Sequence, residues 1–469
     1  VTLIADARHQ VALHEATKRL KQLATTDPVT GLPNRMLLLD RLGQALALAR
    51  RERRHVALLV LDIDGFRGIN ESFGHTAGDE ALAEMARRVQ RRLRSSDTAG
   101  RASGGELAAV LTTVASPEDA ELVARDMLEQ VARPFELHGR EIFVTASIGI
   151  ATSPRDATDA ALLLQHAEVA MHAAKGRGGN AYQVFSPSMA VEAHERMSLS
   201  SSLRRALERH ELVLHYQPQV DARTGRVVAV EALVRWNHPE LGLLGPPSFL
   251  PLAEESGLIV DIDRWVVGTA CGQAAAWAAD GVDIGRVAVN ASTRTLEEPD
   301  FVETVAEALT RWELQPSMLE IEITETALMH AGGEATQTLM DLRSMGVGIA
   351  IDDFGAGYSS LRYLKQLPVD TLKIDQAFVM DIGSHVPGNH ADIAILKSII
   401  ALGQGLGLRL VAEGVETEGQ RDMLRFLHCD VMQGLLVRHP VPPADLADLL
   451  GGMSRRRLRR RVHAGDALA

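Results

Sequence analysis

Short apolar runs alternate with helical segments through the second half of the chain. We expect strands at 212–217, 227–234, 286–290, 319–323, 347–351, 371–375, 408–412 and 431–437, with helices between them. Eight strands that alternate with helices are typical of a β/α barrel, whose strands converge on one mouth. The pattern therefore predicts a (β/α)8 domain, which we place at residues 209–450.

The first half of the chain has a mixed rhythm of strands and helices. We expect strands at 56–62, 142–151 and 181–185, a hairpin at 98–112, and helices at 79–93, 117–132 and 158–175. This order is typical of one α+β domain, at residues 26–186. Pro187 and the polar stretch after it predict a linker over 187–208, helical from about 190.

Both ends of the chain carry segments outside these two domains. Within residues 1–25, Leu13, Ala16, Leu20 and Leu23 have coiled-coil spacing over only two heptads. A dimerising signal helix and a solvated leader are equally compatible with this pattern. The tail at 451–469 contains six arginines between 455 and 461, which indicates either a solvated tail or a site for anionic lipid or a partner.

Composition narrows the class of protein. The chain has 469 residues, 46% of them hydrophobic, and a formal net charge of −12, which is unlike a nucleic-acid-binding protein. Cys271 and Cys429 match no zinc or redox spacing, so we expect buried thiols. No apolar run is long enough to span a membrane. Because the chain starts with valine, we expect a cytoplasmic piece of a longer protein, with a sensor domain upstream that is soluble or membrane-anchored.

Polar residues follow the apolar strands of the expected barrel. They are Glu231, Asn290, Glu322, Asp352 with Asp353, Lys373, Glu413 and Gln433. Any one of these carboxylates alone is better explained as a surface charge or helix cap, but all of them at strand ends indicate a site. Such an acidic ring is costly without a cation inside it. Oxygen ligands suit two Mg²⁺ or Mn²⁺ ions, and pairs of such ions are used by enzymes that hydrolyse phosphate esters.

Two segments of the barrel carry a family resemblance. Glu231-Ala232-Leu233-Val234-Arg235-Trp236 and the segment 352–360, which begins Asp352-Asp353-Phe354-Gly355, resemble the EAL family over about 205–445. The resemblance implies a TIM-like barrel that hydrolyses cyclic di-GMP to linear pGpG. It implies metal ligands at Glu231, Asn290, Glu322, Asp352, Asp353 and Glu413. It further implies catalytic roles for Glu231, Asp353, Lys373 and Glu413. Glu325 would steady the metal ligands and the 352–360 loop, and Gln433 would position the attacking water. The resemblance also implies substrate contacts from Gln217, Leu233, Arg235 and Asp375.

One departure from the EAL pattern lies after Gln433-Gly434. The family usually has aromatic residues there, and this chain has Leu435 and Val437. We expect weaker packing against guanine and no change in the metal ligands.

The first domain is similar to the GGDEF family over roughly 26–186. The resemblance rests on the segments Asp62–Asn70 and Gly74–Asp79. It implies a palm-like α+β domain that condenses GTP, with Asp62 as a metal ligand, Asn70 and Asp79 reading guanine and Lys175 at phosphate. Arg94 and Asp97 have the spacing of the family's product-inhibition site, although a helix end with an ion pair explains them as well.

The signature of that family is altered here. Ser103-Gly104-Gly105-Glu106-Leu107 stands where the family has Gly-Gly-Asp/Glu-Glu-Phe, so Gly105 replaces a metal-binding carboxylate. His172 and Gly179 also depart from the usual tyrosine and basic residue. We expect cyclase activity to be lost and GTP binding to remain as a regulatory input.

These residues fit three functions to different degrees. A metal-dependent cyclic di-GMP phosphodiesterase, expected to be a homodimer, explains the full set of ligands. A non-catalytic cyclic di-GMP receptor is the alternative, and such receptors generally lose metal ligands. A bifunctional synthase and hydrolase is disfavoured by Gly105.

Overall fold

The computed structural model describes residues 25–330, 332–355, 367–380, 382, 390–448 and 450. The expected N-terminal helix before residue 25, loop residues 356–360 and the arginine-rich tail lie outside the described residues. The chain divides into two compact units, Val1–Met197 and Ser198–Ala469, each considered by itself below. Among the described residues, no helix combines the length and apolarity needed to cross a membrane.

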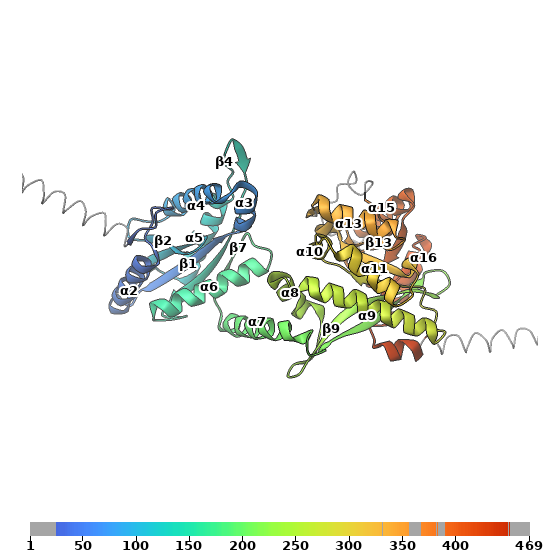
Figure 1. Ribbon diagram of the computed structural model, residues 1–469. Coiled ribbons are helices and arrows are strands. Elements are labelled where there is room, and N and C mark those ends of the chain that lie inside the picture. Colours follow the sequence, from blue (N-terminus) through green and yellow to red (C-terminus); the bar gives the residue numbers. More distant parts are fainter. Residues whose placement is uncertain are drawn as a thin grey trace, which may run out of the picture. The chain divides into compact units, whose positions relative to one another are not determined.

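The first unit is built on a five-stranded sheet with the order β2-β3-β1-β6-β7 (Figure 1). The strands are β1 (His55–Ile63), β2 (Thr98–Ser103), β3 (Glu106–Val114), β6 (Ala146–Ser153) and β7 (Ala181–Val184). All neighbours are antiparallel except β6 and β7. A separate hairpin consists of β4 (Phe135–Leu137) and β5 (Arg140–Ile142). The expected α+β fold is confirmed.

Helices cover both faces of this sheet. Alternate residues of β1 enter two different cores, with Leu58 packed beside α2 (Arg35–Glu52) and α6 (Ala160–Gly176). Leu59 packs on the other side with α4 (His75–Gln90) and α5 (Pro117–Val131). The central strand is therefore an apolar run that is buried on both faces.

Two elements of the first unit differ from the sequence prediction. The helix expected at 79–93 is preceded by α3 (Phe66–Phe73) and begins at His75, because Gly74, at φ +83°, breaks the helical path. The strand expected at 142–151 is divided at residues 143–145, because Ile142 ends β5, which pairs with β4, and β6 begins at Ala146 and pairs with β1. Helix α7 (Pro187–Ala206) starts at the proline, a residue suited to the first helical position.

The second unit is a closed eight-stranded barrel, as predicted. Its strands are β8 (Leu212–Asp221), β9 (Val227–His238), β11 (Arg286–Asn290), β12 (Leu319–Thr324), β13 (Gly348–Phe354), β14 (Thr371–Ile374), β15 (Arg409–Ala412) and β16 (Val431–Met432). Pairing of β8 with both β9 and β16 closes the ring. A ninth strand, β10 (Gly242–Leu244), extends β9 outside the ring.

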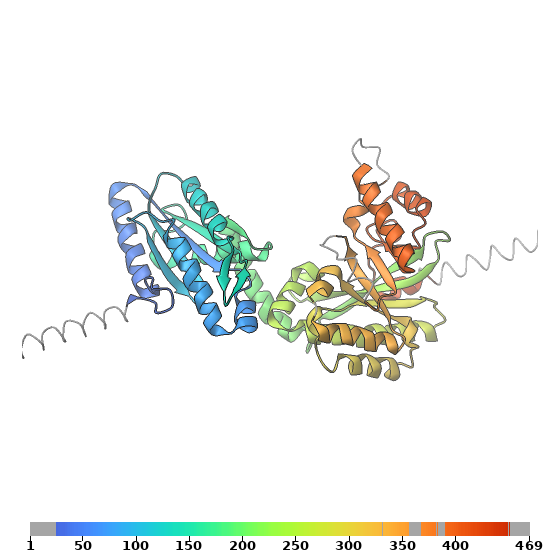
Figure 2. The same cartoon turned by 90° about the horizontal axis from the view of Figure 1, so that it is seen from above.

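Helices surround the barrel (Figure 2). The longer ones are α9 (Ile259–Ala279), α11 (Phe301–Arg311), α13 (Gly333–Ser344), α15 (His390–Leu406) and α16 (Glu418–Phe426). Short elements are η1 (Pro246–Ser248), α8 (Leu250–Ser256), α10 (Thr293–Leu296), η2 (Pro316–Met318), α12 (Glu325–His330) and η3 (Gln376–Phe378). The core between strands and helices includes Tyr216 packed edge-on against Trp277. Cys271 and Cys429 are free and buried, as expected.

The barrel departs from a regular β/α repeat at its first strand. Strand β8 runs antiparallel to both neighbours and joins β9 through residues 222–226 with no helix between them. A connection this short can only make a hairpin, because a parallel pair needs a long crossover. Glu231 therefore lies within a long strand instead of at a strand end, since β9 continues to His238 along β8 and β10.

Candidate active site

Strand alternation brings the EAL-motif side chains to the inside of the barrel. Glu231 pairs with Gln217 on β8, and Leu233 and Arg235 follow on the same face of β9 at two-residue intervals. The intervening Ala232, together with Val230, Val234 and Trp236, belongs to the outer core. One strand thus supplies three site side chains.

The Lys373 ammonium lies at the centre of an acidic cluster. Its Nζ is 2.7 Å from Glu322, 2.8 Å from Glu413, 3.0 Å from Asp352 and 3.5 Å from Glu231. Lys373 is fully buried. Burial alone would lower the pKa of this ammonium, but the four carboxylates outweigh it and raise the pKa well above its usual value. Lys373 therefore stays charged.

The carboxylates exceed what one ammonium can neutralise. Burial, with help from neighbouring acids, raises the pKa of Glu322 well above its ordinary value and that of Glu413 to about 8. The pKa of Asp353 rises to about 6 through burial and the proximity of Asp352 and Asp375. At Glu231, burial is outweighed by Lys373 and by amide donors, so its pKa is lowered. The excess negative charge favours a bound cation.

Two groups of carboxylates fit a pair of divalent cations. Glu231, Glu322 and Asp352 form one group, and Asp352, Asp353 and Glu413 form the other; within each, one oxygen per residue lies within 4.8 Å of the others. Asp352 belongs to both. Glu322 Oε1 is buried and has no hydrogen-bond partner among the described residues, which leaves it available as a ligand. A donor set made only of oxygen suits Mg²⁺ or Mn²⁺.

Amide side chains orient Glu231. Asn290 Nδ2 donates to Glu231 Oε1 at 2.9 Å, and Gln433 Nε2 donates to Glu231 Oε2 at 2.5 Å. As a metal ligand, Asn290 would use Oδ1, the other atom of its amide. Gln433 also donates to Gln217 and accepts from Gln219, both at 2.9 Å. Gln219 is absent from the sequence prediction, although its position two residues after Gln217 on one strand was a usable signal.

Other expected residues lie around this cluster. Glu325 Oε2 accepts a hydrogen bond from the Gly355 backbone N–H at 2.7 Å, at the start of the 352–360 loop. Asp375 caps η3 by accepting from the Ala377 N–H at 2.6 Å, and it adjoins Asp353. Arg235 Nη1 donates to its neighbouring carbonyl, that of Val234. Glu325 and Asp375 therefore stabilise the backbone that follows β13 and β14.

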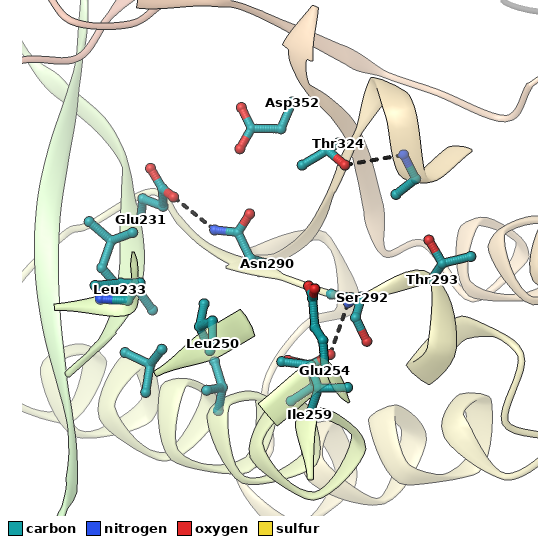
Figure 3. A pocket seen from close by; sticks show the side chains of 17 residues that line it. Glu231, Leu233, Leu250, Glu254, Ile259, Asn290, Ser292, Thr293, Thr324 and Asp352 are labelled. Carbon is teal, nitrogen blue, oxygen red and sulfur yellow. Dashed lines mark hydrogen bonds between the residues drawn. The ribbon is translucent and has the colours of Figure 1, made fainter. Parts of the chain in front are cut away.

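A pocket of about 380 Å³ adjoins the cluster (Figure 3). Leu233 and Leu250 lie on one side of the pocket and Thr293 and Thr324 on the other, with Ile259, Glu254 and Ser292 close together between them. Glu231, Asn290 and Asp352 lie at the edge of the pocket. The polar residues Glu254, Ser292 and Thr293 were not predictable from the sequence, because they lie on or beside short helices without a strand pattern.

The two departures from the family pattern lie away from this pocket. Val437 lines a different pocket of about 390 Å³ beside α16, together with Leu436 and Val415. Leu435 is 60% exposed. Neither Leu435 nor Val437 is among the described residues that line the pocket beside the acidic cluster.

The expected nucleotide residues of the first unit lie on β1, α3, α4 and α6. Lys175 forms an ion pair with Asp62. Asn70 is on α3, where its side chain packs over Gly78, and Asp79 is exposed on α4. Gly105 lies in the β2–β3 turn, and a Cβ there would lie 3.0 Å from the Phe66 ring. Lys175 thus neutralises Asp62, the carboxylate that the resemblance gives as a metal ligand.

Local contacts explain two further positions in that unit. Gly179 has φ +71°, and a Cβ there would lie 2.8 Å from Asp64 Oδ2, so a larger residue would be strained. Asp97 accepts hydrogen bonds from the backbone N–H of Arg94 and of Thr112, both at 3.1 Å. Asp97 therefore has a structural role before β2, and an inhibitory site at Arg94 and Asp97 stays a prediction.

Comparison with known families identifies both units. The EAL domain model matches residues 200–440, and the diguanylate cyclase GGDEF domain model matches residues 24–181. The chain belongs to the GGDEF–EAL family. Its second unit is the EAL domain and its first unit the GGDEF domain.

Two curated relatives from Pseudomonas aeruginosa cover most of the GGDEF–EAL chain. The bifunctional diguanylate cyclase/cyclic di-GMP phosphodiesterase MucR is 44% identical over 435 residues, which is 93% of this chain and 63% of MucR. The cyclic di-GMP phosphodiesterase NbdA is 40% identical over 438 residues, which is 93% of this chain and 55% of NbdA. The chain thus spans only about half to two thirds of these relatives.

Solved structures resemble the EAL domain and the tandem arrangement. A MucR phosphodiesterase in complex with c-di-GMP is 47% identical, with a TM-score of 0.50 over 53% of this chain and 99% of that one. The S helix–GGDEF–EAL part of Vibrio cholerae LapD, also bound to c-di-GMP, has a TM-score of 0.61 over 91% of this chain and 99% of that one. At 19% identity, the likeness to LapD concerns the fold alone.

Proposed function

We propose that the EAL domain hydrolyses cyclic di-GMP to linear pGpG. The observation that carries the proposal is the pair of acidic groups that share Asp352, set beside a 380 Å³ pocket. The relatives named as cyclic di-GMP phosphodiesterases support the substrate. In this reaction the oxygen of water joins phosphorus, the bond to the 3′ oxygen breaks, and that oxygen gains a proton.

Two Mg²⁺ or Mn²⁺ ions would be held by Glu231, Asn290, Glu322, Asp352, Asp353 and Glu413. Bound there, they would supply an acidified water and a positive field for the phosphate oxygens. Lys373 holds the carboxylates together and limits the repulsion between them. Gln433, whose amide already faces Glu231, would position the attacking water.

Substrate recognition would use the walls of the pocket. Leu233, with Leu250 and Ile259, offers an apolar surface for a base, and Glu254 offers a carboxylate acceptor that suits the N–H edge of guanine. By family resemblance, Gln217, Arg235 and Asp375 would contact the rest of the dinucleotide.

The GGDEF domain is proposed to be a GTP-responsive regulator without cyclase activity. Gly105 has no side chain to ligate a metal, and Asp62 is already paired with Lys175. Asn70 and Asp79 remain for guanine. MucR is named as bifunctional, so synthesis has to be assayed alongside hydrolysis. A homodimer and an upstream sensor domain remain part of the proposal.

The test is incubation of the purified chain with cyclic di-GMP and Mg²⁺ or Mn²⁺, with and without GTP, followed by chromatography. We expect pGpG from the wild type, a rate that changes with GTP, and no product from Glu231→Ala, which should remain folded. Glu240→Ala, an exposed glutamate on the same unit, is the control. Binding of cyclic di-GMP without turnover by the wild type would favour the receptor function instead.

A further inference from the structure

Gln219 is a buried amide inside the barrel, one level below the acidic cluster. It is 1% exposed and lies on β8 opposite Ala229, two residues from Gln217, which lies opposite Glu231. Because residues two apart on a strand share a face, Gln219 and Gln217 both point toward the interior. The methyl group of Ala229 leaves room for the longer side chain.

The hydrogen bonds of Gln219 have a fixed direction. Gln219 Nε2 donates to Gln433 Oε1, and Gln433 Nε2 donates to Gln217 Oε1 and Glu231 Oε2. An ionised carboxylate can only accept, so Gln433 has to present its NH₂ group to Glu231. The Gln433 carbonyl oxygen then faces inward and needs a donor, which Gln219 supplies. The Gln217 NH₂ group donates in turn to the Arg438 carbonyl at 2.9 Å.

We propose that Gln219 is a positioning residue that fixes the Gln433 amide and, through it, the Glu231 carboxylate. This inference rests on the proposed metal-dependent function of the EAL domain. Without the donor at 219, a 180° turn of the Gln433 amide becomes accessible and places its carbonyl oxygen against Glu231. Two acceptors repel each other, so the carboxylate loses the orientation that holds the cation.

The expected effect is on cation binding and on turnover. Hydrogen-bond partners of metal ligands typically contribute about 10–100-fold in metal affinity. We expect Gln219→Met, which keeps the volume but removes the donor, to weaken Mn²⁺ binding by roughly tenfold and to lower kcat/KM by a similar factor. Gln219→Asn keeps an amide one methylene short of Gln433 and should act the same way. It serves as the second variant if Gln219→Met does not fold.

The experiment is a calorimetric titration of the metal-free chain with Mn²⁺, paired with cyclic di-GMP kinetics. Gln420→Met is the matched control, because Gln420 is a buried glutamine whose amide donates to the Val379 and Met380 carbonyls. It should change the unfolding temperature and leave Mn²⁺ affinity within twofold of wild type. When Gln433→Met is already present, adding Gln219→Met should lower Mn²⁺ affinity and kcat/KM little further, because the effect of Gln219 passes through Gln433.

Each outcome separates the inference from the proposed function. The positioning role alone would be overturned if folded Gln219→Met and Gln219→Asn keep their Mn²⁺ affinity and kcat/KM within twofold of wild type. Weakened Mn²⁺ binding in these variants, with no hydrolysis by the wild type, would uphold the positioning role and overturn the phosphodiesterase. Absence of Mn²⁺ binding by the wild type would overturn both.

Discussion

Lys373 Nζ and Glu322 Oε2 lie 2.7 Å apart, and both side chains are fully buried. The other oxygen of Glu322 has no hydrogen-bond partner among the described residues. Only one of the two carboxylate oxygens of Glu322 is therefore paired. An ion pair of this kind holds a ligand in place while it leaves one oxygen for a cation.

Removal of Lys373 should destabilise the metal-free EAL domain. Lys373→Met leaves four carboxylates, three of them buried, without their ammonium. Breaking a buried ion pair costs about 3–5 kcal/mol. We expect denaturant titration in chelator to show a loss of about 3 kcal/mol in the free energy of unfolding, and hydrolysis to fall below detection. Lys397→Met, at an exposed lysine of α15, should be neutral. An unchanged stability in Lys373→Met would contradict the central role given to this ammonium.

Hydrolysis should require a small divalent cation. The ligands come from separate strands of a closed barrel, which favours the compact coordination of Mg²⁺ or Mn²⁺ over the larger and looser coordination of Ca²⁺. We expect chelator to abolish pGpG formation, Mg²⁺ or Mn²⁺ to restore it, and Ca²⁺ to inhibit in competition with either ion. Equal rates in Ca²⁺ would argue against the assigned pair of sites.

Asp263 should make the stability of the EAL domain depend on pH. This buried carboxyl accepts hydrogen bonds from the Ser292 N–H and the Thr295 hydroxyl, yet burial raises its pKa to about 6. Since the folded pKa lies above the ordinary 3.8, the contribution of Asp263 is complete below pH 3.8 and is lost as the pH rises through 6.

The matching variant is Asp263→Asn, which keeps an acceptor for both donors and cannot ionise. Its free energy of unfolding relative to wild type should rise by about 3 kcal/mol between pH 4 and pH 7, at 1.4 kcal/mol for each pKa unit. Asp283→Asn, at an exposed aspartate, should show no such trend. A parallel pH dependence in wild type and Asp263→Asn would mean that Asp263 stays ionised when folded.

Restoring a carboxylate in the GGDEF signature should not by itself restore synthesis. A Cβ at Gly105 would lie 3.0 Å from the Phe66 ring, so an aspartate there requires the ring to shift. His172 and Gly179 would also still depart from the family pattern. We expect Gly105→Asp to form no detectable cyclic di-GMP from GTP by chromatography. Robust synthesis by this variant would show that a single carboxylate separates the domain from activity.

The barrel and its acidic ring were predictable because both follow from local pattern. Apolar runs mark the strands, and polar residues such as Asn290 and Glu413 directly follow them. The direction of β8 was not predictable from its own residues, because the same apolar run can form a parallel or an antiparallel strand. The short connection to β9 was the available signal.

Long-range partners account for what the sequence did not reveal. Lys373 was expected to have a catalytic role, but the sequence does not reveal that four carboxylates from other parts of the barrel surround it. Gln219 has a role only through Gln433, more than two hundred residues away. The placement of Val437 away from the pocket likewise depends on distant residues, because it lines a second pocket with Val415 and residues of α16.

The pairing of β8 with β16 ties the beginning of the barrel to its end. Val220 faces Met432, and Tyr216 forms a bridge with Val441. During synthesis, β8 and β9 leave the ribosome long before their last partner exists, and one edge of the growing sheet stays unpaired until residue 432 has emerged. The barrel can close only when nearly the whole domain has been made, so truncated products that end before β16 should be prone to aggregate.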